Sequence, residues 1–340
     1  MKKDYFSDYL KKKDIEEEKV KEFIFRIANY ENFLEMENYS IETASFNKLI
    51  EYCEKLVAND KDSVLNFLIA MINYANFIKR NDIITQIIDI SESYNAMDTL
   101  FSRMADYYGE NLRDDIFQDM IIPPLGVNPE KKPDFTKKIL IKIEEICGEE
   151  KVIHLLSPCL HGRPPEDIEG DKKYLKDYGI DAFLSKKYQD LIERLNLHKE
   201  EDTLEFAQPI DDEVINFVKA NPKFGTGIRD GNVIYLSKLP YQIKKFLNED
   251  DEKMKQFYIC YCPWVRGALK NGTSNQIPKY FCQCSAGWYK LYWDQIFGQS
   301  IKVVPIKTAL DGSLECTFAV YLPESINENL NEKDEVRKDA

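Results

Sequence analysis

Hydrophobic positions in the first part of the chain recur at helical spacing. Apolar residues at 46–56 lie three or four positions apart, and the same stripe returns over 64–78 and 83–108. Residues 11–37 follow a similar period but carry more charge. These patterns predict a helical bundle over residues 1–120, the first part of an α+β protein.

A proline-rich stretch at 122–129 interrupts the helical pattern, and this composition is typical of a linker. A helix is predicted to resume over 139–146, and a loop that contains Cys159 and His161 follows it. Two short helices are expected within 171–197. Residues 121–202 are therefore predicted to form a linker and a helical segment with a Cys-x-His loop.

The pattern changes at about residue 203, where short strands and helices alternate. Asp230-Gly231 is typical of a hairpin turn, and Ser285 is a candidate cap for a helix that ends at Phe297. Strands are predicted at 226–229, 232–237, 257–262, 301–310 and 314–322. The region 203–323 is therefore expected to be an α+β domain with a mainly antiparallel sheet, followed by a flexible tail at 324–340.

Composition and charge narrow the classes of partner. The chain is 44% hydrophobic and 12% aromatic, which is enough for a sizeable core. Its net charge of −13 argues against binding to nucleic acid or anionic lipid, because both require clustered Lys and Arg. The N-terminus lacks the pattern of a secretory signal, and the most apolar window is too short to span a bilayer. We therefore expect a cytoplasmic protein, with self-association through the helical region as a further expectation.

Two Cys-x-Cys pairs are the chief chemical feature of the sequence: Cys260 and Cys262, then Cys282 and Cys284. Alternate residues of a strand point to the same face, so the first pair is predicted to converge. The second pair falls where a strand leads into a helix, and a helix N-terminus favours thiolates. Four thiolates from two neighbouring segments could bind zinc in tetrahedral geometry. Buried free thiols remain the alternative to this zinc site.

The same cysteines could instead serve catalysis. Cys262 or Cys284 could be a nucleophile, with Arg266 holding the thiolate ionised or gripping a substrate carboxylate. Cys159 and His161 form a second candidate site, because a Cys-x-His loop offers two soft ligands and His161 could act as a base. Redox exchange between the two Cys-x-Cys pairs is a further possibility.

The C-terminal part resembles known families over about residues 255–323. Cys262-Pro263-Trp264, Phe281-Cys282 and the run from Lys307 to Phe318 are similar to the pattern of the L-2-amino-thiazoline-4-carboxylic acid hydrolase family. The ordering also resembles 4-vinyl reductase-type small-molecule-binding domains, and clostridial proteins with Cys-x-Cys-Pro-Trp and Phe-Cys-x-Cys-Ser stretches. On the hydrolase pattern the cysteines that carry over are Cys262, Cys282 and Cys316.

The resemblance implies a small-molecule or metal-binding protein, or a hydrolase of C–N bonds in a small amino-acid derivative. Cys260 and Cys284 depart from the hydrolase pattern, as do Ser285 and Ala286, which stand where the family often has an acidic residue. These departures favour a four-cysteine zinc site over thiazoline hydrolysis. The prediction is therefore a sensor-like binding protein, with the thiol- or metal-dependent hydrolase as the alternative.

Overall fold

The structure is a computed structural model that describes residues 3–60, 63–164, 167–205 and 208–324. The chain divides into two compact units, each built from segments that are separate in the sequence. Unit 1 comprises residues 1–94, 121–135 and 262–267, and unit 2 comprises the segments between and after them. The units therefore do not follow the consecutive domains expected from the sequence.

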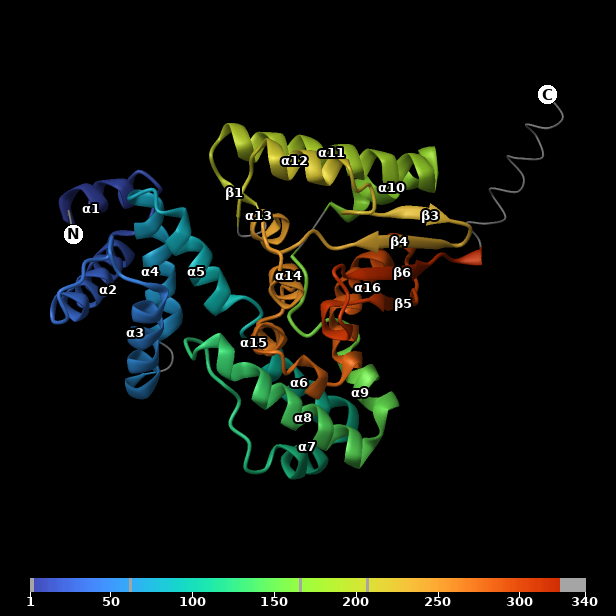
Figure 1. The fold of residues 1–340 in the computed structure, drawn as a ribbon, viewed down its shortest axis with the longest axis horizontal. Helices are drawn as coiled ribbons and strands as arrows, with labels where there is room; N and C mark the ends of the chain where they lie inside the picture. Colours follow the sequence, from blue (N-terminus) through green and yellow to red (C-terminus); the bar gives the residue numbers. More distant parts are fainter. Residues whose placement is uncertain (1–2, 61–62, 165–166, 206–207, 325–340) are drawn as a thin grey trace. The chain divides into compact units, whose positions relative to one another are not determined.

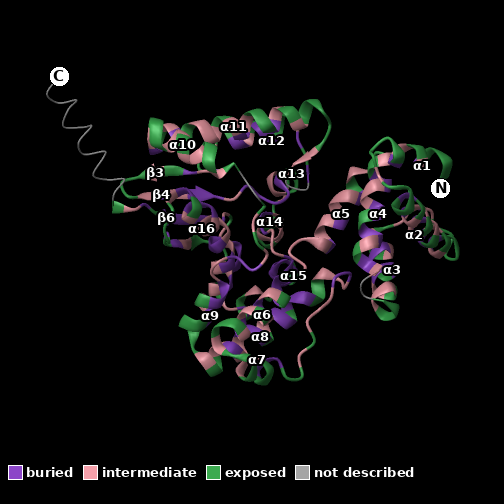
Figure 2. Ribbon diagram, turned by 180° about the vertical axis from the view of Figure 1, so that it is seen from behind, coloured by how far each residue is buried: buried purple, intermediate pink, exposed green. Residues whose placement is uncertain are grey.

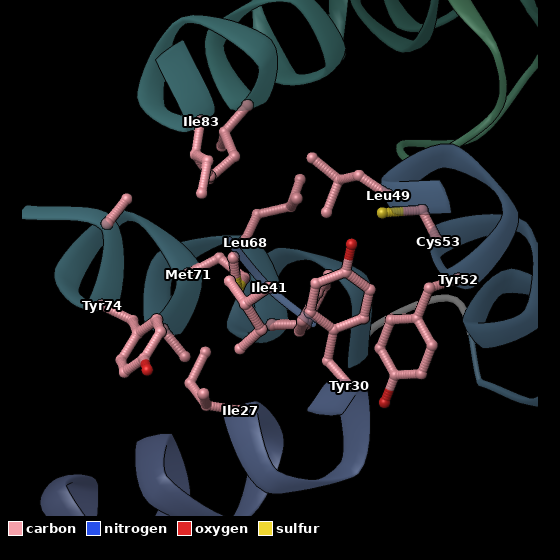
Figure 3. Close-up of a cluster of buried hydrophobic side chains, with 14 of the residues drawn as sticks. Ile27, Tyr30, Ile41, Leu49, Tyr52, Cys53, Leu68, Met71, Tyr74 and Ile83 are labelled. Atoms are coloured by element: carbon pink, nitrogen blue, oxygen red, sulfur yellow. The ribbon is translucent and has the colours of Figure 1, made fainter. Parts of the chain in front are cut away.

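The helices of unit 1 form a bundle that covers part of the predicted helical region, whose residues 95–120 belong to unit 2: α1 (Lys3–Lys11), α2 (Glu17–Glu35), α3 (Phe46–Asn59), α4 (Ser63–Phe77) and α5 (Asn81–Ser91). Buried and exposed positions alternate along α2 in Figure 2, as expected for an amphipathic helix. Aliphatic and aromatic side chains from all five helices meet in one core, part of which Figure 3 shows. Tyr30, Tyr52 and Phe67 pack with ring centroids 4.8–5.3 Å apart.

A second packing region in unit 1 is built around a buried lysine. Lys132 is fully buried, and its Nζ lies 5.1 Å from the ring centroid of Trp264 and 3.5 Å from the carbonyl oxygen of Ile90. The Trp264 indole N–H donates to the Ser93 carbonyl at 2.9 Å. Arg266, 6% exposed, donates to Asp89 at 2.8 Å. The short segment 262–267 thus attaches to the end of α5 through polar contacts.

Unit 2 contains most of the remaining helices and all strands of the described chain. The helices wholly within it are α6 (Ala96–Tyr108), α7 (Glu110–Phe117), α9 (Glu149–Leu156), α10 (Ile168–Tyr178), α11 (Ile180–Glu200), α12 (Asp212–Lys219), α13 (Ile243–Leu247), α14 (Glu252–Ile259) and α16 (Gln283–Phe297). Helices α8 (Lys132–Cys147) and α15 (Pro263–Asn271) begin in unit 1 and continue into unit 2.

The main sheet confirms the predicted α+β class and antiparallel pairing. Its order is β3–β4–β6–β5, formed by Ile228–Asp230, Val233–Ser237, Thr317–Tyr321 and Val303–Lys307. Every neighbouring pair is antiparallel. Helix α16 packs on β5 and β6, α10 packs on both α16 and α11, and α11 packs on α12 (Figure 1). A separate two-stranded ladder joins β1 (Leu204–Glu205) to β2 (Gln208–Pro209).

The predicted strand at 257–262 is wrong, because residues 257–259 end helix α14 and residues 260–262 form the short connection to α15. Asp251 caps α14 by accepting a hydrogen bond from the Met254 N–H at 2.9 Å. Pro263 is the first residue of α15, where its missing N–H has no helical partner to lose. Both signals outweigh the short apolar alternation that indicated a strand.

Other boundaries also differ from the predictions. Helix α16 begins at Gln283, two residues before the expected cap, so Cys284 lies in its first turn. Helix α11 has 21 residues, longer than expected for this region. A 3₁₀ turn at Ala309–Asp311 separates β5 from β6, so both strands are shorter than predicted. Nearly all of the predicted tail at 324–340 lies outside the described residues.

In the described part of the chain, every helix is too short or too polar to cross a bilayer.

Lys132 makes the stability of unit 1 depend on pH. Burial lowers the pKa of its ammonium group from 10.5 to about 8, although Cys262 and Glu92 oppose this shift. Below pH 8 the amine is charged in both states, so burying the charge costs about 3 kcal/mol. This cost disappears as the pH rises from about 8 to 10.5, since the folded protein releases its proton first.

We therefore expect Lys132→Met to have the larger free energy of unfolding at pH 7, by about 1–3 kcal/mol. Its advantage over the wild type should shrink between pH 8 and 10.5 in urea unfolding experiments. Lys131→Met is the matched control, because the Lys131 side chain is 63% exposed and pairs with Glu54 at the surface. A difference for Lys132→Met that does not change with pH would contradict the prediction.

Candidate metal centre

The loop that follows α9 is held in place by a guanidinium group. Arg103 of α6 donates to the carbonyl oxygens of Leu155 at 2.6 Å and Cys159 at 3.2 Å, and also to that of Pro158. One planar side chain with several donors can bind three carbonyl groups because its N–H bonds point in fixed directions. The backbone on both sides of Cys159 is therefore anchored to α6.

Helix α16 approaches this loop closely at Gly287. A Cβ atom at Gly287 would lie 2.4 Å from the backbone nitrogen of Cys159 and 2.9 Å from the carbonyl carbon of Pro158. Only glycine permits this approach without displacing the loop. Cys284 is one turn earlier on the same helix, so its side chain faces the loop beside Gly287. The Leu160 N–H donates to the Cys284 sulfur at 3.3 Å.

Three potential metal ligands meet at this contact. The ligand atoms of Cys159, His161 and Cys284 all lie within 4.8 Å of one another, and this is the one such group of three or more His, Cys, Asp or Glu found among the described residues. Both cysteines are buried, whereas His161 is partly exposed. Two sulfurs and one imidazole could therefore hold a metal ion.

The second layer around the ligands is aromatic and cationic. The His161 ring packs against Trp288, with centroids 5.3 Å apart. Arg163 donates to the Trp288 carbonyl at 3.1 Å, and its guanidinium carbon lies 4.6 Å from the Tyr292 ring centroid. These contacts fix the other end of the loop to the same face of α16 that carries Cys284.

Cys284 affects the acidity of the Cys159 thiol. A hydrogen bond with Cys284 raises the pKa of Cys159 and burial raises it further, while His161 acts in the opposite direction. Without a cation, the neutral thiol of Cys159 is therefore favoured. A bound divalent cation would reverse this preference, because coordination requires the thiolate.

Two of the other predicted zinc ligands, Cys260 and Cys282, lie near Cys316 in unit 2. Burial raises the pKa of Cys282 well above its usual value, and the nearby Cys316 and Cys260 raise it further. Cys316 is 8% exposed and accepts a hydrogen bond from the Ala309 N–H at 3.4 Å. Cys282 and Cys260 are therefore neighbours of Cys316, and neither belongs to the three-ligand group.

Cys262 and Arg266 belong to unit 1, and neither is part of the three-ligand group. Arg266 was predicted to hold a thiolate or a substrate carboxylate, but its guanidinium is buried and pairs with Asp89. Of the four predicted zinc ligands, the group therefore retains Cys284 alone. Its partners are Cys159 and His161, the residues of the second candidate site.

In comparisons with protein families, curated proteins and solved structures, nothing matches the chain. The resemblance to the thiazoline hydrolase family therefore stays a prediction.

The close contact at Gly287 predicts an unusual response to alanine. Alanine in place of glycine in a helix interior normally stabilises by about 1 kcal/mol. Gly287→Ala should instead lower the free energy of unfolding by about 1–3 kcal/mol, because the new methyl group must push the Cys159 backbone away.

Urea unfolding measures this effect. Gln295→Ala, at an exposed position of the same helix, is the control and should change stability by less than about 0.5 kcal/mol. A stabilised Gly287→Ala variant would mean that the helix and the loop are not in contact at this position.

Proposed function

We propose that this protein binds zinc through Cys159, His161 and Cys284, and that a small-molecule ligand occupies the fourth position on the metal. The convergence of the three ligand atoms within 4.8 Å carries this proposal. Tetrahedral zinc with Zn–S bonds of about 2.3 Å and Zn–N bonds of about 2.0 Å sets its ligand atoms roughly 3.5 Å apart. Small side-chain rotations are enough to reach this spacing.

The donor set favours zinc over other abundant cations. Two thiolates and an imidazole are soft or borderline ligands, which suit zinc, whereas magnesium and calcium require oxygen ligands. Free cysteines of this kind persist in a reducing compartment, in agreement with the cytoplasmic location predicted from the sequence.

The number of ligands distinguishes this site from a structural zinc site. Structural sites generally have four protein ligands, while catalytic sites have three and leave one position for water or substrate. The proposed site therefore also supports the alternative that the protein is a zinc-dependent hydrolase. In that case the metal would lower the pKa of a bound water, and the chain would position the substrate beside it.

Metal analysis of purified variants tests the ligand set. The wild type should bind one zinc ion per chain, and Cys159→Ser, His161→Gln and Cys284→Ser should each lose most of it. Cys260→Ser, Cys262→Ser and Cys282→Ser are matched controls, because each removes a cysteine outside the group. They should retain zinc at the wild-type level.

Cobalt substitution gives a second measurement that is independent of protein yield. Co²⁺ bound to the wild type should show sulfur-to-metal charge-transfer absorption, weakened in either thiolate variant and absent without protein. Zinc loss in the three control variants would instead favour the Cys-x-Cys pairs as ligands. A wild-type protein that binds neither metal would refute the proposed function.

A further inference from the structure

Lys238 is a second lysine in an unusual environment, located in unit 2 directly after strand β4. Its backbone N–H donates to the Cys316 carbonyl at 2.9 Å, which extends the pairing between β4 and β6 by one residue. The partly buried side chain reaches Ser285, with its Nζ atom 3.3 Å from the hydroxyl oxygen. The same Nζ lies 5.3 Å from the ring centroid of Tyr261 and 6.0 Å from that of Phe318.

Among the described residues, Lys238 forms no ion pair with a carboxylate within 4.0 Å. The groups with the largest electrostatic effect on it are the phenol of Tyr289 and the thiols of Cys316, Cys159 and Cys260. Burial opposes the positive charge of Lys238. A partly buried cation surrounded by thiols and phenols is costly unless an anion accompanies it. The missing partner therefore points to an anionic ligand.

Helix α16 connects Lys238 to the candidate metal centre, because it carries both Ser285, which Lys238 contacts, and the metal ligand Cys284. Ser285 is the residue after Cys284, and Tyr289 lies one turn beyond Ser285, just as Trp288 lies one turn beyond Cys284. The helix thus presents two adjacent ridges. One ridge faces the metal-ligand loop, and the other faces Lys238.

Tyr289 lies on the ridge that faces Lys238, but its hydroxyl also interacts electrostatically with Arg163 of the metal-ligand loop. Its ring packs against Phe318 with centroids 5.1 Å apart. Burial raises the pKa of its hydroxyl, while Lys238 and Arg163 both act to lower it. The hydroxyl is therefore within electrostatic reach of two cations, one next to Ser285 and one on the metal-ligand loop.

We propose that Lys238 and Ser285 bind the carboxylate of a small-molecule ligand that also reaches the fourth position of zinc at Cys159, His161 and Cys284. This inference rests on the proposed function and specifies its ligand class. One ammonium group and one hydroxyl supply two kinds of donor, which suits the two oxygens and single charge of a carboxylate. A phosphate group would require more donors than these residues provide. The flanking rings of Tyr261 and Phe318 favour an apolar body on the ligand.

Trifluoroacetate is a suitable probe, because its fluorine resonance reports binding at a carboxylate site. Protein loaded with paramagnetic Co²⁺ should strongly increase the fluorine relaxation rate, and protein loaded with diamagnetic Zn²⁺ is the reference. Lys238→Met should weaken probe binding roughly tenfold, as expected for the loss of a charge-assisted hydrogen bond. Lys238→Arg should retain part of the affinity.

Lys302→Met is the matched control, because Lys302 also lies over an aromatic ring, 5.1 Å from the Tyr321 centroid, but is exposed. This variant should bind the probe as the wild type does. Equal probe affinity in the wild type and Lys238→Met would overturn the inference while leaving zinc binding intact.

Failure of Co²⁺ to bind would instead refute the proposed function, and the carboxylate site is then tested on metal-free protein. If metal-free wild type broadens the fluorine line more than Lys238→Met does, the carboxylate site exists independently of the metal. The same broadening in the wild type and Lys238→Met would overturn it.

Discussion

The close contact between Gly287 and the backbone of Cys159 is the constraint on which the candidate metal centre depends. It brings a helix near the C-terminus against a loop near the middle of the chain, a sequence separation of 124 residues for the Leu160–Cys284 hydrogen bond. Arg103 fixes the loop from one side and Arg163 fixes it from the other. The two cysteines and His161 then meet because the backbones on which they stand are held close together.

This arrangement explains which parts of the structure could be predicted from the sequence. The N-terminal helices and the hairpin of β3 and β4 follow from local periodicity and from Asp230-Gly231, so both could be predicted. The single bundle expected over residues 1–120 is instead divided between the two units. The Cys-x-His loop was also identified as a candidate site. Its partner Cys284 was assigned to a different set of ligands, because pairing across such a separation depends on packing at one glycine.

The misassigned strand shows a related limit of local patterns. Phe257, Ile259 and Tyr261 alternate over too short a stretch to distinguish a strand from the end of a helix. The capping Asp251 and the helix-starting Pro263 were the decisive signals, and both lie outside the apolar alternation. Cys260 and Cys262 lie in the connection between α14 and α15, so the argument that they share a strand face no longer applies.

The division of the chain into interleaved segments has a practical consequence. The backbone passes between the two units five times, after residues 94, 120, 135, 261 and 267. No single cut can release either unit whole, and a fragment that stops at residue 94 would lack Lys132, Trp264 and Arg266. Such a fragment would expose the end of α5 that these residues cover, so truncated versions of this protein are poor substitutes for the full chain.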